Sequence, residues 1–132
     1  MPNDVQIINS LRSNLLEAEY TQWRKGLVRH PNQYVIDIDQ VEFRGDTPVA
    51  LIDLKTWPRY ETPSYWEKVA KSSYTFAGKM YRKQAQSMGC KAYYVFPNFD
   101  IDTVMVYGLS DNFGWRRITV EGYEKWLMTL PE

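Results

Sequence analysis

The sequence predicts an α/β fold in which helices flank a small mixed sheet. Apolar residues recur at helical spacing in three parts of the chain, and β-branched or continuous apolar runs lie between them. The resulting order is helix, strand, strand, helix, strand, strand, helix, which is typical of helices packed on a sheet. The chain has 132 residues, of which 44% are hydrophobic, so we expect a single domain over residues 1–132.

The first helix is predicted over residues 3–26. Asn3 or Asp4 can cap its start, and Gly26 can end it. At about 100° per residue, one broad stripe of this helix collects the apolar side chains of Ile8, Leu15, Leu16 and Trp23. After a loop over residues 30–33, the alternating residues 34–43 predict a strand, and residues 44–48 predict a turn.

The second strand is predicted over residues 49–55, which are mostly apolar, as in the centre of a sheet. Residues 56–63 contain two prolines and are expected to be irregular. Residues 64–88 predict a helix, with an interruption near Ser72–Ser73, that ends at Gly89.

The C-terminal part of the chain predicts two more strands and a helix. The strands cover residues 90–96 and 103–109, and Pro97 with Asn98 closes the first of them. Thr119 is expected to cap the last helix, whose apolar residues at helical spacing are Tyr123, Trp126, Leu127 and Leu130.

Composition excludes several classes of site. Cys90 is the only cysteine and His30 the only histidine, so an internal disulfide, a cysteine-based zinc site and a two-histidine zinc hydrolase cannot be built. Sixteen basic and sixteen acidic residues give no net charge, which argues against a nonspecific coat on nucleic acid. No apolar run approaches the ~20 residues of a membrane span, and no leader follows Met1, so we expect a cytoplasmic protein in a reducing compartment. Any enzyme chemistry should therefore use carboxylates and lysines.

Two aspartates and a lysine form the candidate site. Side chains alternate along a strand, so Asp53 and Lys55 should share one face of the sheet. A hairpin can place Asp39 of the preceding strand beside them. Two neighbouring carboxylates repel each other, and a divalent cation with oxygen ligands, usually Mg²⁺ or Mn²⁺, relieves that repulsion. Asp37 lies on the same strand face as Asp39 and is the alternative ligand.

Asp39, thirteen intervening residues and then Asp53-Leu54-Lys55 resemble the signature of the PD-(D/E)xK nuclease superfamily. The hairpin is similar to that of archaeal Holliday junction resolvases and RecB-like nucleases, although Ile38 replaces the proline and Asp53 the commoner glutamate. The resemblance implies a restriction-endonuclease-like αβββαβ core with a mixed central sheet flanked by helices. It also implies that Asp39 and Asp53 bind Mg²⁺ or Mn²⁺ and that Lys55 positions the attacking water.

The function that the resemblance implies is metal-dependent hydrolysis of phosphodiester bonds in DNA, in recombination or repair. A compact domain without a recognition module favours structure-selective cutting of branched, flap or end DNA, and the sequence does not distinguish DNA from RNA. Many relatives add a glutamate from the first helix, and the helical wheel favours Glu19, which lies on the apolar stripe, over Glu17 as a catalytic metal ligand.

Further residues are candidates for binding nucleic acid. Gln84 and Gln86 precede Gly89, where related nucleases carry a glutamine near the site, and three cations lie nearby. Aromatic side chains that follow the signature can stack on bases or form a homodimer interface. The candidates are Lys79, Arg82, Lys83, Gln84, Gln86, Trp57 and Tyr60.

Two other functions remain open. Asp37 and Asp39 could form the acidic pair of a nucleotidyltransferase, although no Gly-Ser turn precedes them. Alternatively, a nuclease-like fold could serve as a non-catalytic nucleic-acid-binding or assembly module, which the zero net charge favours.

Overall fold

The computed structural model describes residues 18–20, 22–23, 26–28, 31, 38–110 and 113–131. The chain forms two compact units, Met1–Val35 and Ile36–Glu132. In the first unit, residues 18–20 and 22–23 are helical, within the predicted first helix. The remainder of that helix, including Glu17, and the start of the predicted first strand, including Asp37, lie outside the described residues.

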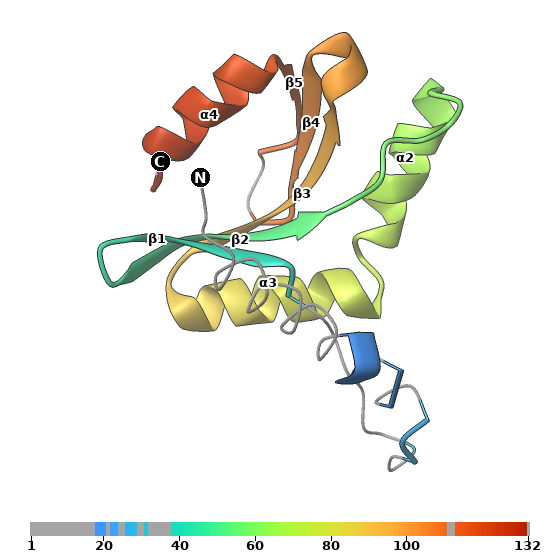
Figure 1. Cartoon of the computed structure of the whole chain (residues 1–132), viewed down its shortest axis with the longest axis vertical. Coiled ribbons are helices and arrows are strands. Elements are labelled where there is room, and N and C mark those ends of the chain that lie inside the picture. Colours follow the sequence, from blue (N-terminus) through green and yellow to red (C-terminus); the bar gives the residue numbers. More distant parts are fainter. Residues whose placement is uncertain are drawn as a thin grey trace, which may run out of the picture. The chain divides into compact units, whose positions relative to one another are not determined.

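The second unit is built on a mixed five-stranded sheet (Figure 1). Its strands are β1 (Gln40–Arg44), β2 (Thr47–Leu54), β3 (Lys91–Asn98), β4 (Thr103–Gly108) and β5 (Trp115–Ile118), and they lie in that order across the sheet. β2 and β3 are parallel, and the other neighbouring pairs are antiparallel. The predicted α/β class with a mixed sheet is therefore confirmed.

The parallel pair requires a crossover, which two helices provide. α2 (Pro63–Ser72) begins where Thr62 caps it, and α3 (Phe76–Met88) ends at Gly89, whose φ of 74° is left-handed. The predicted interruption lies between these helices. Gly78 permits the tight junction, because a Cβ there would come within 1.8 Å of the Ser73 carbonyl oxygen.

The last helix, α4 (Val120–Met128), is capped as predicted, since the Thr119 hydroxyl accepts a hydrogen bond from Gly122 N at 3.0 Å. β5, just before this helix, was not predicted. β3 also extends further than expected, and a short 3₁₀ turn, η1 (Phe99–Ile101), connects it to β4. Within the described ranges, no helix is long and apolar enough to cross a membrane.

Helices cover both faces of the sheet. Trp126 of α4 and Leu130 pack with Ile52 and other side chains of one face. Tyr81 of α3 packs with Leu51 and other side chains of the opposite face. Because strand side chains alternate, Asp53 projects from the same face as Leu51, towards the side that α3 covers.

Candidate metal and catalytic site

Asp53 is a buried carboxylate in the apolar part of β2, with 5% of its surface exposed. Lys55 follows one residue beyond the strand, and its backbone N donates to Val95 O at 2.8 Å, which continues the pairing with β3. The Lys55 Nζ lies 3.0 Å from Asp53 Oδ2. This oxygen is buried and has no hydrogen-bond partner among the described residues, so Lys55 is bound to it as an ion pair. The predicted common face of these two side chains is present.

Asp39 lies directly before β1 and meets Asp53 across the hairpin. Its Oδ2 accepts a hydrogen bond from Leu54 N at 2.9 Å, and its carboxylate is near enough to raise the pKa of Asp53. The register explains this contact, because Gln40 pairs with Ile52 and the next residues along the two strands are Asp39 and Asp53. The structure therefore brings together the two aspartates that the sequence paired.

A bulge in the hairpin sets this register. Near the turn, Phe43 pairs with Pro48, but the next pair is Glu42 with Ala50, so Val49 is an extra residue on β2. A one-residue slip moves side chains to the opposite face of a strand. Without the extra residue, Asp39 would be opposite Ile52 rather than Asp53.

Tyr81 of α3 is a third neighbour of Asp53, and the sequence interpretation missed it. Its side chain is 6% exposed, and its hydroxyl is near enough to Asp53 for that carboxylate to raise the pKa of Tyr81. Its ring packs edge-on against Tyr94 at 6.3 Å between centroids, and the Lys55 Nζ lies 4.8 Å from the centroid of the same Tyr94 ring. A signal existed in the sequence: Tyr81 shares a helical stripe with Ala85, and a buried tyrosine hydroxyl needs a polar partner.

The site contains two carboxylates, Asp39 and Asp53, and one ammonium group, Lys55, so the lysine neutralises only part of the negative charge. Burial raises the pKa of Asp53, and the nearby Asp39 raises it further, whereas Lys55 acts in the opposite direction. Burial alone would lower the pKa of Lys55, but the contact with Asp53 outweighs it and the pKa is raised. Burial and the two carboxylates also raise the pKa of Tyr81. An added cation would relieve the strain on the aspartates.

The residues present fit a magnesium ion. Within the described part of the chain, no group of three or more histidine, cysteine, aspartate and glutamate side chains is placed to share a metal. Mg²⁺ does not require such a cage, because it keeps several waters and is usually bound through one or two carboxylates together with substrate phosphates. Asp39 and Asp53 provide that donor set.

The other predicted metal ligand and several predicted nucleic-acid-binding side chains are exposed. Glu19 is exposed in the first unit, so its role as a metal ligand stays a prediction. Four side chains predicted to bind nucleic acid are exposed on α3, and their binding also stays a prediction: Lys79, Lys83, Gln84 and Gln86.

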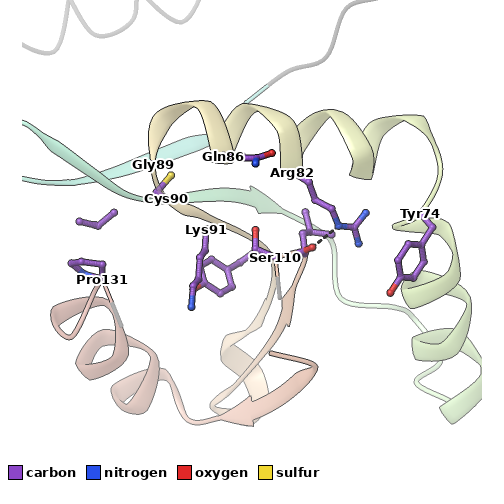
Figure 2. Close-up of a pocket in the computed structure, with 11 residues that line it drawn as sticks. Tyr74, Arg82, Gln86, Gly89, Cys90, Lys91, Ser110 and Pro131 are labelled. Atoms are coloured by element: carbon purple, nitrogen blue, oxygen red, sulfur yellow. Dashed lines mark hydrogen bonds between the residues drawn. The ribbon is translucent and has the colours of Figure 1, made fainter. Parts of the chain in front are cut away.

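Arg82 on the same helix contacts the protein itself. Its guanidinium donates to Ser73 O at 2.5 Å and to Leu109 O, and lies 4.7 Å from the Tyr74 ring centroid. It lines a cavity of about 720 Å³ (Figure 2). The cavity lies beside Lys91, at the start of β3. Asp53 of β2 pairs with Tyr94, which lies further along β3, and Asp53 does not line the cavity. The cavity is thus separate from the carboxylates, and a contact of Arg82 with nucleic acid stays a prediction.

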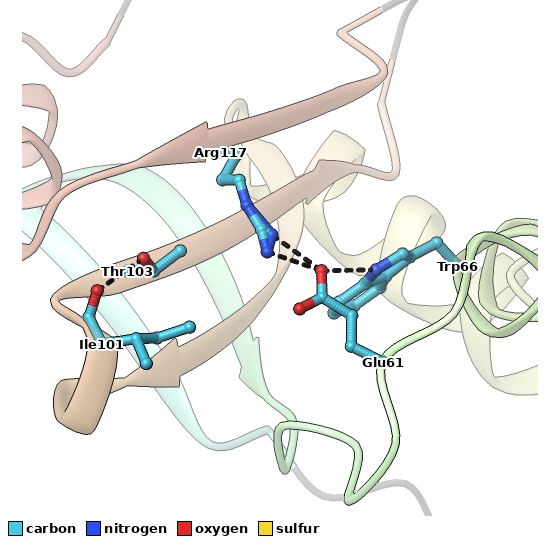
Figure 3. Close-up of polar contacts among 5 residues, drawn as sticks. All are labelled: Glu61, Trp66, Ile101, Thr103 and Arg117. Carbon is cyan, nitrogen blue, oxygen red and sulfur yellow. Dashed lines mark hydrogen bonds and ion pairs between the residues drawn. The ribbon is translucent and has the colours of Figure 1, made fainter.

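The aromatic residues after Lys55 differ in exposure. Trp57 is half-buried and packs edge-on against Trp66 at 5.4 Å between centroids. Trp66 Nε1 donates to Glu61, which also forms an ion pair with Arg117 at 2.5 Å (Figure 3). Tyr60, by contrast, is 74% exposed and is therefore available to a ligand.

Searches against protein-family models, curated proteins and solved structures each gave no match, so the resemblance to the PD-(D/E)xK nucleases stays a prediction.

Proposed function

We propose that this protein is a Mg²⁺-dependent deoxyribonuclease of the PD-(D/E)xK type with a restriction-endonuclease-like core. The observation that carries the proposal is the position of Asp39 across the hairpin from Asp53, whose carboxylate pairs with the Lys55 ammonium. Two neighbouring carboxylates, one of them buried, are unfavourable unless a cation is shared between them. The order of hairpin, helical crossover and parallel strand supports the proposal, because it matches the later part of the αβββαβ core that the resemblance implies, although the described residues hold two strands before the crossover and not three.

The side chains divide the work of phosphodiester hydrolysis between them. Asp39 and Asp53 would bind the cation through their carboxylate oxygens. Bound Mg²⁺ or Mn²⁺ supplies polarisation of the scissile phosphate and a more acidic water. Lys55 is held between Asp53 and the Tyr94 ring, and its raised pKa keeps it protonated at neutral pH. It therefore acts as a charged hydrogen-bond donor to a phosphate oxygen or to the attacking water, rather than as a base.

The substrate that we propose is DNA with a branch, flap or free end. The loop after Lys55 carries Tyr60 and Arg59, with the guanidinium 5.4 Å from the Tyr60 ring centroid. An exposed aromatic ring beside a cation can stack on an unpaired base and attract the backbone. A homodimer in the cytoplasm belongs to the same proposal.

The test is cleavage by the purified full chain of single-stranded, duplex, flap and branched DNA, and of RNA, with Mg²⁺ or Mn²⁺ and with EDTA. Cleavage should require the metal. Lys55→Ala should lower the rate by about 10²-fold, the usual loss for a positioned catalytic group. Lys125→Ala is the matched control, since this exposed lysine pairs with Glu121 on α4, which packs on the opposite face.

Cleavage that persists in EDTA would contradict the metal role. Equal activity of Lys55→Ala and Lys125→Ala would show that the candidate site is wrong. No cleavage of any substrate would instead favour the non-catalytic binding module.

A further inference from the structure

The cavity at the start of β3 is separate from the candidate metal and catalytic site and has a volume of about 720 Å³. In Figure 2, α3 carries Arg82 and Gln86 along one side of the cavity. Lys91 and Ser110 lie across from this helix. Small-molecule sites in proteins typically have volumes of about 300–1,000 Å³. The cavity is therefore large enough for an organic ligand.

Arg82 brings to this cavity a positive charge that no described carboxylate balances. Its guanidinium donates to Ser73 O at 2.5 Å, to Ser73 Oγ at 3.3 Å and to Leu109 O. These acceptors are uncharged, and among the described residues no acidic side chain forms an ion pair with Arg82. A guanidinium has more N–H donors than these bonds use. Arg82 is thus a cation held in a fixed position with donors left for a ligand.

The lining of the cavity adds no carboxylate that would repel an anion. Its described residues include no aspartate or glutamate. Burial raises the pKa of the Cys90 thiol, which is therefore uncharged at neutral pH. At the end of α3, the backbone N–H groups of Gly89 and Cys90 donate to carbonyl oxygens of the last turn at 3.1 and 2.9 Å. These bonds reduce the partial negative charge of the helix end.

The rest of the lining provides surface for the organic part of a ligand. Ser110 follows Leu109, whose carbonyl binds Arg82, so its hydroxyl and the guanidinium lie at the same part of the cavity. The Ser110 hydroxyl accepts from Ala92 N at 3.1 Å and keeps its own proton to donate. A mainly apolar wall with a few polar groups is typical of small-molecule sites. The apolar and aromatic lining residues are Val49, Tyr74, Tyr93, Leu109 and Pro131.

We propose that this cavity binds a small phosphate monoester of about the size of a mononucleotide, with Arg82 as the partner of the phosphate. A guanidinium forms paired, charge-assisted hydrogen bonds with phosphate oxygens. A phosphate monoester also has more terminal oxygens than a carboxylate, so it can accept from the Ser110 hydroxyl as well. The inference goes beyond the proposed function and does not depend on it, because it uses neither the aspartates nor a metal.

The ligand class is tested by calorimetric titration of the purified full chain with adenosine 5′-monophosphate, with adenosine and with inorganic phosphate. EDTA is present throughout, so that no metal at the carboxylates contributes to binding. The monophosphate should bind more tightly than either of the other two ligands by about 10-fold or more, because it alone combines the charged hydrogen bonds with the apolar contacts.

Gln86→Glu tests the site. Arg82 is less suitable for substitution, because its bonds to Ser73 and Leu109 also support the fold. Gln86 lies four residues after Arg82 on α3, so a carboxylate there competes with the ligand for the guanidinium and repels the phosphate. Affinity for the monophosphate should fall by about 10-fold. Gln84→Glu is the matched control, since it makes the same charge change on an exposed α3 residue that does not line the cavity, and it should leave the affinity unchanged.

Four outcomes would overturn the inference. Wild-type protein that does not bind the monophosphate would refute it while leaving the proposed nuclease intact. Equal affinities for adenosine and its monophosphate would show that Arg82 does not bind the phosphate. Equal affinities for inorganic phosphate and the monophosphate would exclude an organic ligand. Equal affinities of Gln86→Glu and Gln84→Glu for the monophosphate would show that the cavity is not the binding site.

Discussion

Asp53→Asn should stabilise the protein when no metal is bound, although it should abolish cleavage. Burial and Asp39 hold the pKa of Asp53 above its ordinary value of 3.8, so its charged form is less favourable in the folded than in the unfolded chain. Asparagine has the same shape and no charge.

The magnitude follows from opposing contributions. The substitution removes the cost of a buried charge and its repulsion with Asp39, but it breaks the ion pair with Lys55. The lysine side chain is 41% exposed, so this ion pair contributes about 0–1 kcal/mol. Since the pKa of Asp53 is raised despite Lys55, the unfavourable contributions are larger. We expect a net gain on the order of 1 kcal/mol at pH 7, the size of other stabilising changes at functional sites.

The dependence of stability on pH tests independently whether Asp53→Asn stabilises the protein. A carboxyl group with a raised folded-state pKa contributes stability below its unfolded pKa, and that contribution is lost as pH rises through the folded value. The gain in the free energy of unfolding from Asp53→Asn should therefore be small near pH 4 and increase towards pH 7. Mn²⁺ at 100 times its Kd should reverse the order, because it stabilises the wild type by about 2.7 kcal/mol and the variant little.

The assay is urea unfolding in EDTA at pH 4 and pH 7, then with Mn²⁺ at pH 7. With a slope of roughly 2 kcal/mol per molar urea, the gain would move the midpoint by about 0.5 M. Asp46→Asn, in the exposed turn between β1 and β2, is the control and should stay within ~0.5 kcal/mol. A loss of stability in Asp53→Asn at pH 7, or a difference independent of pH, would refute the reasoning.

Two paired comparisons test other parts of the molecule. Arg82→Ala should lower the free energy of unfolding by about 1–3 kcal/mol, because it leaves the carbonyl of the buried Ser73 without its donor, whereas the exposed neighbour Lys83→Ala should stay within ~0.5 kcal/mol. Equal urea midpoints for the two variants would contradict the role given to Arg82. Glu19→Gln should weaken Mn²⁺ binding or cleavage, whereas Glu17→Gln should leave both unchanged and alter stability by no more than ~0.5 kcal/mol. Titration and cleavage assays with the reverse pattern would mean that the first helix is rotated from the predicted orientation.

The order of helices and strands in the second unit could be predicted from the sequence because their signals are local. The apolar run of β2, Gly89 after α3 and the Thr119 cap act within a few residues of the chain. β5 could not be found in this way. Its four residues include the consecutive arginines Arg116 and Arg117, so apolar and polar residues do not alternate as they do in a typical strand. The strand is instead stabilised by its pairing with β4.

The candidate site could be predicted only in part, for the same reason. Asp53 and Lys55 are two residues apart on one extended segment, so alternation alone places them together. The contact with Asp39 depends on a single extra residue in the hairpin, and nothing in the local sequence identifies Val49 as that residue. Tyr81 reaches Asp53 only after two helices have crossed over the sheet, which makes it a property of the tertiary structure.

The composition of β2 argues that its end is a functional site rather than a structural one. Val49 through Ile52 are at most 5% exposed, and Asp53 continues the strand at the same burial. Had the fold needed only a paired carboxylate there, Lys55 would be a sufficient partner. Asp39 accepts a hydrogen bond from Leu54 N, which a neutral side-chain oxygen could also accept, so the charge of Asp39 adds repulsion that folding does not require. The bulge that brings it opposite Asp53 also interrupts the strand pairing. A local charge repulsion that lowers stability is typical of a site that binds or transforms a ligand. Since both groups that create the cost are anions, the ligand that would relieve it is a cation.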